Sequence, residues 1–437
     1  MDPEHGDKVK ITTDSEEFIG ILMPRPEILE KGIVAIKLDT GYNIGIDEKK
    51  IKKIEVLEKY KLAAKKHPKI GHQKNLPTVS VLSFGGTISS KVDYKTGGTY
   101  ADYTAEDFVE MLPELEDAAN IRAEKVMGIM SEDMNPAHWD LMARRIAKEL
   151  NDDEVKGVVV THGTDTMHYS AAAMSFFLKN INKPVIFTGA QRSIDRGSSD
   201  AFSNLLCSVH AAAKFDGAAV AICMHATSND GFCILSRGTK VRKMHTSRRD
   251  AFRPIDELPL AKIYDDGKIE AINKNHKKRN HGKAEVDSKF EQKTALVYTY
   301  PGMDAGIFDY FIKSKYRGIV IVGTGLGHVA GCVDSFDSKS EYSVYNKLKE
   351  LRKNGIAIVI GSQTIYGRVH PYVYTNLRRL SMELDCIYSE DMLPETAYVK
   401  LGWVLSHENK IEEIKKMMLA NVAGEITERS DESVFLY

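Results

Sequence analysis

The hydrophobic pattern divides the chain into a short β-rich beginning and a long stretch in which strands alternate with helices. Short apolar runs cut by turn residues occupy the first ~60 residues. These runs are GDKVKITT, EFIGILMP, GIVAIKLDTGYNIGI and KIEVLE. They predict a small β-barrel-like unit over residues 1–60. The basic segment 59–73 that follows is typical of a solvated linker.

From residue 77 the pattern changes to strand, helix, strand, helix. The expected strands are TVSVLSF, GVVVTH, PVIFTG and GAAVAICMHA, and the expected helices are TAEDFVEMLPEL, PAHWDLMARRIAKEL and SAAAMSFFLKN. Thr104, followed by Glu106 and Asp107, is typical of a helix start with acidic residues in its first turn. Such alternation predicts an α/β fold built on mainly parallel sheets.

A polar and basic segment, INKNHKKRNHGK, separates this unit from a second, shorter α/β unit. The second unit has apolar runs in TALVYTY, RGIVIVGTGLGH and GIAIVIGS, and a helical pattern in EYSVYNKLKELRKN. We therefore expect a β-rich accessory domain, a linker, a first α/β domain with the chemically interesting loops, a second linker and a second α/β domain. The expected boundaries are 1–60, 61–76, 77–271, 272–292 and 293–437.

The composition excludes several classes of protein. A chain of 437 residues exceeds the size at which one hydrophobic core divides. Lys and Arg number 60 and Asp and Glu number 61, so no general basic field draws nucleic acid to the surface. The five cysteines are dispersed, which favours a reducing compartment over a disulfide framework or a zinc site. With a polar N-terminus and no run of ~20 apolar residues, we expect a cytoplasmic protein outside the membrane.

Small, hydroxyl-rich loops follow the expected strands of the first α/β unit. They read SFGGTISS, THGTDTM, TGAQRS and MHATSND, and the carboxyl ends of parallel strands meet at one edge of a sheet. Each loop by itself is also typical of a well-capped strand-to-helix turn. Together they favour a site in which a threonine hydroxyl becomes a nucleophile once a base removes its proton.

The lysine that such a threonine needs has candidates in the basic segment RGTKVRKMHTSRRDAF, over residues 237–252. Lys240 and Lys243 both qualify, and we expect most other side chains of this segment to be solvated. Competing motifs fail, because GTGLGH has His328 where a dinucleotide loop needs its third glycine, and a phosphate-binding loop is absent. His162 and His168 do not have the spacing of a helical zinc site.

These loops resemble the signatures of the L-asparaginase/glutaminase family. SFGGTISS is similar to the first active-site signature, VVVTHGTDTM to the second, SEDM to the substrate-clamping loop between them and VIFTGAQR to the next strand and loop. The likeness extends from about residue 76 to residue 408. It implies a two-domain asparaginase-like fold and amide hydrolysis through an acyl-enzyme on threonine.

The resemblance also implies roles for individual residues. Thr87 matches the nucleophile, while Thr164, Asp165 and Lys243 match a proton relay, with Lys243 preferred over Lys240. The substrate would be held by the backbone and side chains of Gly86, Ser131, Glu132, Gly163 and Asp165. A tyrosine that assists the nucleophile has three candidates, Tyr94, Tyr100 and Tyr103, of which Tyr100 is chosen.

Two departures from simple asparaginases change the expected function. Leu326 and His328 replace asparagines that reach a neighbouring subunit's site in that family, and simple asparaginases lack the N-terminal β-rich unit. With KVRKMHTSRRDAFRPI and EDMLPETAYVKL, the whole chain resembles the D-type subunits of archaeal glutamyl-tRNA(Gln) amidotransferases. A free-standing L-asparaginase remains the alternative.

Membership of that family implies a set of partners. The chain would release ammonia from L-glutamine for an E-type partner subunit, which binds the misacylated tRNA and uses ATP and Mg. It would hold no cofactor of its own, would contact tRNA mainly through the partner, and would form a homodimer within a heterotetramer.

Overall fold

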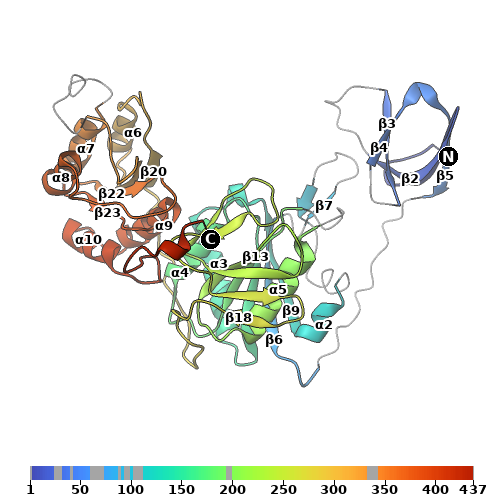
Figure 1. The fold of residues 1–437 in the computed structure, drawn as a ribbon, viewed down its shortest axis with the longest axis horizontal. Coiled ribbons are helices and arrows are strands. Elements are labelled where there is room, and N and C mark those ends of the chain that lie inside the picture. Colours follow the sequence, from blue (N-terminus) through green and yellow to red (C-terminus); the bar gives the residue numbers. More distant parts are fainter. Residues whose placement is uncertain are drawn as a thin grey trace.

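The computed structural model describes residues 2–23, 32–39, 43–59, 73–86, 90–92, 99–101, 112–192, 199–331 and 343–436. Figure 1 shows a small N-terminal sheet, a central α/β domain and a C-terminal α/β domain. Of the expected helix over 104–115, residues 104–111 lie outside the described part. The described remainder contains α2 (Glu114–Ala118).

The N-terminal unit is a five-stranded antiparallel sheet, and the four predicted apolar runs supply its strands. Strand order is β4-β3-β2-β1-β5, so β1 lies between β2 and β5. Alternate residues face inward and form a small core around Val9, Ile11 and Ile36. The strands are β1 (Lys8–Thr13), β2 (Glu17–Met23), β3 (Ile33–Leu38), β4 (Asn43–Asp47) and β5 (Ile51–Glu58).

The central domain is built on an eight-stranded sheet in the order β18-β17-β14-β13-β12-β10-β6-β9. The five strands from β13 to β9 run parallel, and β14, β17 and β18 are added antiparallel at one side. In order along the chain the strands are β6 (Thr78–Gly85), β9 (Asn120–Ile129), β10 (Val155–Thr161), β12 (Val185–Thr188), β13 (Val220–His225), β14 (Phe232–Arg237), β17 (Ala261–Tyr264) and β18 (Ile269–Ala271).

Helices cover both faces of this sheet because successive strand residues point to opposite sides. Val158 and Val160 of β10 pack toward α3 (Pro136–Leu150) and α4 (Met167–Phe177), whereas Val159 packs toward α5 (Ala201–Lys214). The expected helix over 170–180 therefore needs correction at both ends. It begins at Met167 and ends at Phe177, because Leu178 and Lys179 form β11 (Leu178–Lys179), which pairs with β19 (Glu285–Val286).

The C-terminal domain has a four-stranded parallel sheet in the order β20-β21-β22-β23. Its strands are β20 (Thr294–Tyr298), β21 (Gly318–Gly323), β22 (Ala357–Ser362) and β23 (Ile387–Tyr388). Its helices include α6 (Ile307–Lys313), α7 (Val344–Lys353), α8 (Thr375–Arg378), α9 (Pro394–Leu405) and α10 (Ile411–Leu419). Gly355, just past α7, has φ +75°, the left-handed conformation that glycine often adopts after a helix end. The basic residues in the last turn of α7 agree with a helix end at this place.

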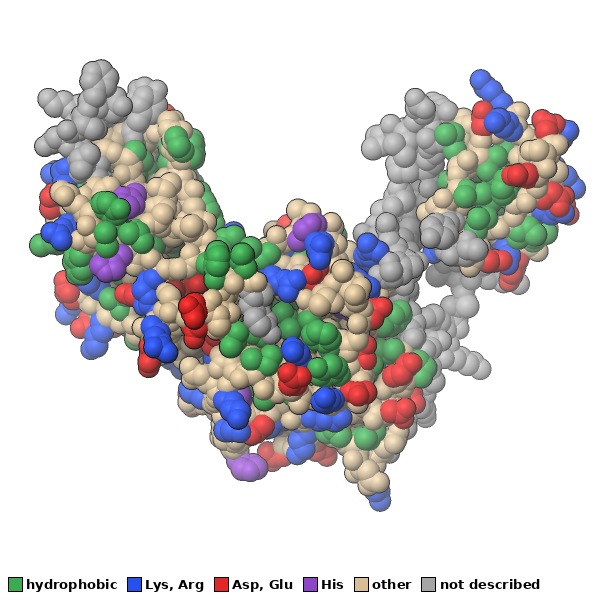
Figure 2. Space-filling model, viewed as in Figure 1, with side chains coloured by type: hydrophobic (Ala, Val, Ile, Leu, Met, Phe, Trp, Pro, Cys, Tyr) green, Lys and Arg blue, Asp and Glu red, His purple; other side chains and the backbone are tan. Residues whose placement is uncertain are grey.

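One hydrophobic core joins the two α/β domains. Val320 and Val322 of β21 and Trp403 of α9 belong to the same buried cluster as α3 and α4 of the central domain. In Figure 1, α9 lies on the side of the C-terminal sheet that faces α4, and the two helices pack together. Acidic and basic side chains are interspersed over the face drawn in Figure 2, in keeping with the balanced charge.

Candidate active site

The hydroxyl-rich loops meet where the parallel strands of the central sheet end. Thr161, the last residue of β10, is in register with Ser83 of β6 and with Thr188 of β12. The loops beyond these strands touch at the backbone. Gly86 has φ +86°, and a Cβ added there would come 2.3 Å from the amide nitrogen of Gly163. Only glycine permits this approach, which brings the first and second signatures together.

The segment that contains Ser131 closes one side of this site. Ser131 is buried directly after β9, and its backbone carbonyl accepts a hydrogen bond from Thr166 Oγ1 at 2.6 Å. A Cβ on Gly163 would lie 2.8 Å from Ser131 Oγ, so these two residues also touch. The neighbouring Glu132 is exposed to solvent. The structure thus brings together four of the five expected substrate-binding residues around the glycines of two loops, and Glu132 lies beside them in sequence.

Lys243 lies between the two side chains with which the relay was predicted. Its Nζ donates to Thr164 Oγ1 at 2.9 Å and to Asp165 Oδ1 at 2.6 Å. The Thr164 side chain and that of Lys243 are largely buried, whereas Asp165 is 66% exposed. The lysine is carried on β15 (Val241–Lys243), which pairs with β16 (Phe252–Pro254). A lysine held this way can exchange a proton with the hydroxyl while the carboxylate compensates its charge.

Lys240, the competing lysine, lies elsewhere. Its Nζ donates to the backbone carbonyl of Asp391 at 2.8 Å and to Asp391 Oδ2 at 2.7 Å, and both side chains are essentially buried. The geometry therefore offers Lys243, and not Lys240, to Thr164 and Asp165. The ion pair of Lys240 was not predicted, because Lys240 and Asp391 are 151 residues apart and share no local pattern.

Thr87 lies outside the described residues, and so do Tyr94 and Tyr103. Tyr100 belongs to the short strand β8 (Thr99–Ala101), which pairs with β7 (Ser90–Val92), but its side chain is also outside the described part. The choice among the three tyrosines therefore stays a prediction, and so does the nucleophile.

A chain of hydrogen bonds connects the loop of the second signature to α3 and α4. Trp139 Nε1 donates to Ser170 Oγ at 3.0 Å, and Ser170 Oγ lies 2.9 Å from His162 Nε2. The other ring nitrogen of His162 lies 2.7 Å from the Gly163 carbonyl. Burial lowers the pKa of His162 to about 4. His162 is therefore neutral at pH 7, and both of its ring nitrogens have hydrogen-bond partners within the protein.

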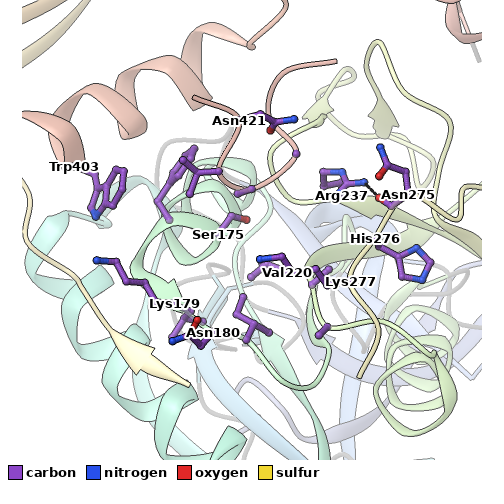
Figure 3. Close-up of a pocket in the computed structure, with 18 residues that line it drawn as sticks. Ser175, Lys179, Asn180, Val220, Arg237, Asn275, His276, Lys277, Trp403 and Asn421 are labelled. Atoms are coloured by element: carbon purple, nitrogen blue, oxygen red, sulfur yellow. Dashed lines mark hydrogen bonds between the residues drawn. The ribbon is translucent and has the colours of Figure 1, made fainter. Parts of the chain in front are cut away.

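A cavity of about 630 Å³ lies at the other end of the central domain. Figure 3 shows Trp403 and Lys179 on one side of it and Arg237, Asn275 and His276 on the other. Arg237 is already held by both oxygens of Glu257, and Lys179 forms an ion pair with Asp287. This cavity contains none of the predicted site residues and is separate from the relay.

Neither a metal cluster nor a membrane span is found in the described part of the chain. No group of three or more His, Cys, Asp or Glu side chains among the described residues has the makeup of a metal site. Within the same residues, no helix is long and apolar enough to cross a membrane.

Comparison with protein families places domains over most of the chain. Residues 78–277 match the family "Asparaginase, N-terminal", and residues 293–418 match the "Glutaminase/Asparaginase C-terminal domain". Residues 3–57 match the "GatD N-terminal domain". Asparaginase structures are similar in fold. The thermostable L-asparaginase from Thermococcus kodakarensis has a TM-score of 0.70 at 28% identity and covers 80% of this chain and 100% of its own. L-asparaginase I from Vibrio cholerae has a TM-score of 0.68 at 27% identity, over 80% of this chain and 99% of its own.

Curated relatives are similar over nearly the whole chain, and all three named here are D-type subunits of glutamyl-tRNA(Gln) amidotransferases. That of Pyrococcus furiosus is 48% identical over 99% of this chain and 97% of its own length. That of Thermococcus kodakarensis is 47% identical over 96% and 92%, and that of Methanopyrus kandleri is 42% identical over 96% and 91%. The N-terminal unit that the asparaginases lack is matched in this group. The chain belongs to the GatD family, the D-type subunits of glutamyl-tRNA(Gln) amidotransferases, with asparaginase-type α/β domains.

Proposed function

We propose that this chain is the glutaminase-type subunit of a tRNA-dependent amidotransferase that converts Glu-tRNA(Gln) to Gln-tRNA(Gln). It hydrolyses L-glutamine and supplies ammonia to an E-type partner subunit. One observation supports the hydrolytic half above all others, namely Lys243 Nζ bonded to both Thr164 and Asp165 at the edge where the loops meet. The names of the relatives support the tRNA-dependent half.

The proposed reaction has two steps, in which Thr87 is first acylated and then freed. The Thr87 hydroxyl attacks the amide carbonyl of glutamine, its proton passes toward the leaving nitrogen, and the C–N bond breaks to release ammonia. Water then cleaves the resulting ester, giving glutamate and free Thr87. In each step the relay of Thr164, Lys243 and Asp165 carries protons, and backbone amides of the glycine-containing loops stabilise the oxyanion.

The amino-acid end of glutamine also needs binding residues. We assign this role to Ser131 and Glu132, with Asp165 near the ammonium group of the substrate. The exposure of Asp165 and Glu132 to solvent leaves both carboxylates accessible to a substrate. Gly86 and Gly163 allow the loops that carry these residues to approach one another closely.

The remaining components of the reaction belong to the partner subunit. We assign ATP and Mg to the E-type partner, along with most contacts to tRNA. The chain itself would form a homodimer within a heterotetramer. Its balanced charge is consistent with a protein that leaves the polyanion largely to its partner.

The test measures ammonia release from L-glutamine and L-asparagine by the purified chain, alone and co-purified with its partner and misacylated tRNA. We expect little turnover by the chain alone and glutamine turnover when partner and tRNA are present. The Thr87→Val variant of the same complex should release no ammonia, because the nucleophile is lost. Rapid turnover of asparagine by the chain alone would instead identify a free-standing asparaginase.

A further inference from the structure

The strand that carries Lys243 is attached to the C-terminal domain as well as to its own. Thr396 Oγ1, in the first turn of α9, donates to the backbone carbonyl of Thr239 at 3.0 Å. The next residue, Lys240, forms the buried ion pair with Asp391. The two residues that precede β15 are thus held by the residues at the start of α9 and just before it.

Arg242, the residue next to Lys243, makes a third connection to the same helix. Its Nη2 lies 2.9 Å from Glu395 Oε1, and Glu395 is only 5% exposed. Burial raises the pKa of this carboxyl group, and the Arg242 guanidinium opposes the rise. The second oxygen, Oε2, has no hydrogen-bond partner among the described residues. A buried carboxylate with a single cationic partner constrains that partner strongly, because separation leaves the charge uncompensated.

Glu395 also faces the helix that follows the other half of the relay. His168 Nε2 lies 4.0 Å from Glu395 Oε1, and His168 belongs to the first turn of α4. This helix starts two residues after Asp165 and packs against α9. The first turn of α9 therefore contacts the strand that carries Lys243 and the helix that follows Thr164 and Asp165.

We propose that Glu395 is a positioning residue, which through Arg242 holds Lys243 in reach of Thr164 and Asp165. The C-terminal domain thereby sets the geometry of a proton relay whose members all belong to the central domain. This inference rests on the proposed amidase function. A displacement of about 1 Å at a reacting group lowers rates by about 100-fold, so loss of this support should appear in turnover.

The primary test is Glu395→Leu in the chain co-purified with its partner, with ammonia release from glutamine measured over a range of concentrations. We expect kcat to fall about tenfold while KM stays within about twofold, because the substrate contacts remain. The conservative variant Glu395→Gln should recover most of kcat, since its amide oxygen still accepts from the Arg242 guanidinium. Wild-type kcat in Glu395→Leu, or a raised KM with unchanged kcat, would overturn the inference.

The matched control is Asp287→Leu, which removes a carboxylate and its ion pairs beyond the other end of α9. Asp287 contacts Lys179 and His407, and its Oδ1 lies 2.9 Å from His407 Nε2. This variant loses a comparable contact without touching β15, so its kcat should match that of the wild type. A tenfold loss of kcat in the control as well would show a general effect of stability and would overturn the inference.

A second variant covers the case in which Glu395→Leu does not fold. The double replacement Arg242→Met with Glu395→Leu removes both charges and fills the space, which often preserves stability. We expect it to fold and to keep the low kcat, and a folded double variant with wild-type kcat would overturn the inference.

If the wild-type complex releases ammonia from neither amide, the proposed function fails, and the inference fails with it. If the wild type and all these variants turn over equally, only the positioning role fails.

Discussion

At the scale of single residues, two lysines three positions apart have different environments. Lys243 contacts an exposed carboxylate and a hydroxyl at the edge of the sheet, whereas Lys240 shares a fully buried ion pair with Asp391. The first arrangement places the ammonium within hydrogen-bond distance of a hydroxyl, with which it can exchange a proton. The second fixes a charge where water does not reach it, so its role is structural.

Replacing each lysine by methionine should therefore give opposite results. Lys243→Met should lower kcat for ammonia release by at least about 100-fold, the usual contribution of a positioned acid–base group. Its free energy of unfolding should change little, because its partner Asp165 is mostly solvated. Lys240→Met leaves the buried Asp391 carboxylate with the Arg368 guanidinium, at 3.8 Å, as its remaining cationic partner, and should cost stability near the lower end of about 3–5 kcal/mol. Denaturant unfolding and steady-state kinetics on both variants check this, and full activity in Lys243→Met would exclude the relay.

At the scale of elements, α4 carries a buried histidine, His168, close to the proposed relay. Burial, then the nearby charges of Arg242 and Lys243, lower the pKa of His168 to about 3. The unfolded chain has an ordinary histidine there, with a pKa of about 6.5. The folded state therefore binds the proton more weakly than the unfolded state. Stability is present in full above about pH 6.5 and is lost as the pH falls toward 3.

The pH dependence of stability should reveal this histidine. Between pH 7 and pH 5 the wild type should lose about 2 kcal/mol more unfolding free energy than His168→Gln, because glutamine takes up no proton. The exposed His281 provides the control, and His281→Gln should follow the wild type. Denaturant unfolding at the two pH values measures the difference. Equal losses in wild type and His168→Gln would show that His168 titrates normally.

The elements were predictable where local pattern decides them. Four of the five parallel strands of the central sheet, β6, β10, β12 and β13, are mainly apolar runs, and the edge at which their loops meet follows from parallel geometry. β9 was missed because its half-exposed sequence, NIRAEKVMGI, has the polarity of a loop. The antiparallel addition of β14, β17 and β18 also escaped, since strand direction depends on tertiary contacts and not on a local signal.

The relay was predictable in part. Thr164 and Asp165 stand in a loop whose position follows from the sheet, but the choice of Lys243 over Lys240 came from family resemblance. Spacing within the basic segment does not separate the two lysines. Their partners do, and Asp391, the partner of Lys240, lies far along the chain in another domain. Long-range ion pairs of this kind leave no periodic trace in sequence.

At the scale of the whole molecule, the two α/β domains share a core while the N-terminal sheet has its own. The shared cluster runs from Leu82 of β6 to Met418 of α10, whereas the N-terminal cluster contains buried residues only from Val9 to Ile46. Domains that share a buried core unfold together, and a domain with a separate core unfolds independently.

Calorimetry of the full chain should therefore resolve a small transition and a large one. The small transition belongs to the N-terminal sheet and the large one to the joined α/β domains. Removal of residues 1–72 should abolish the small transition and leave the temperature of the large one unchanged. Separate transitions for the central and C-terminal domains would contradict the shared core.

The shared core also contains both tryptophans of the chain. Trp139 is 4% exposed and is joined through Ser170 and His162 to the loop of the relay. Trp403 is 5% exposed and lies on α9 beside the cavity of Figure 3. The intrinsic tryptophan fluorescence of the protein therefore comes from the core that the two α/β domains share, and not from the surface. Fluorescence consequently follows the loop that contains Gly163 and the contact between the domains without any attached dye.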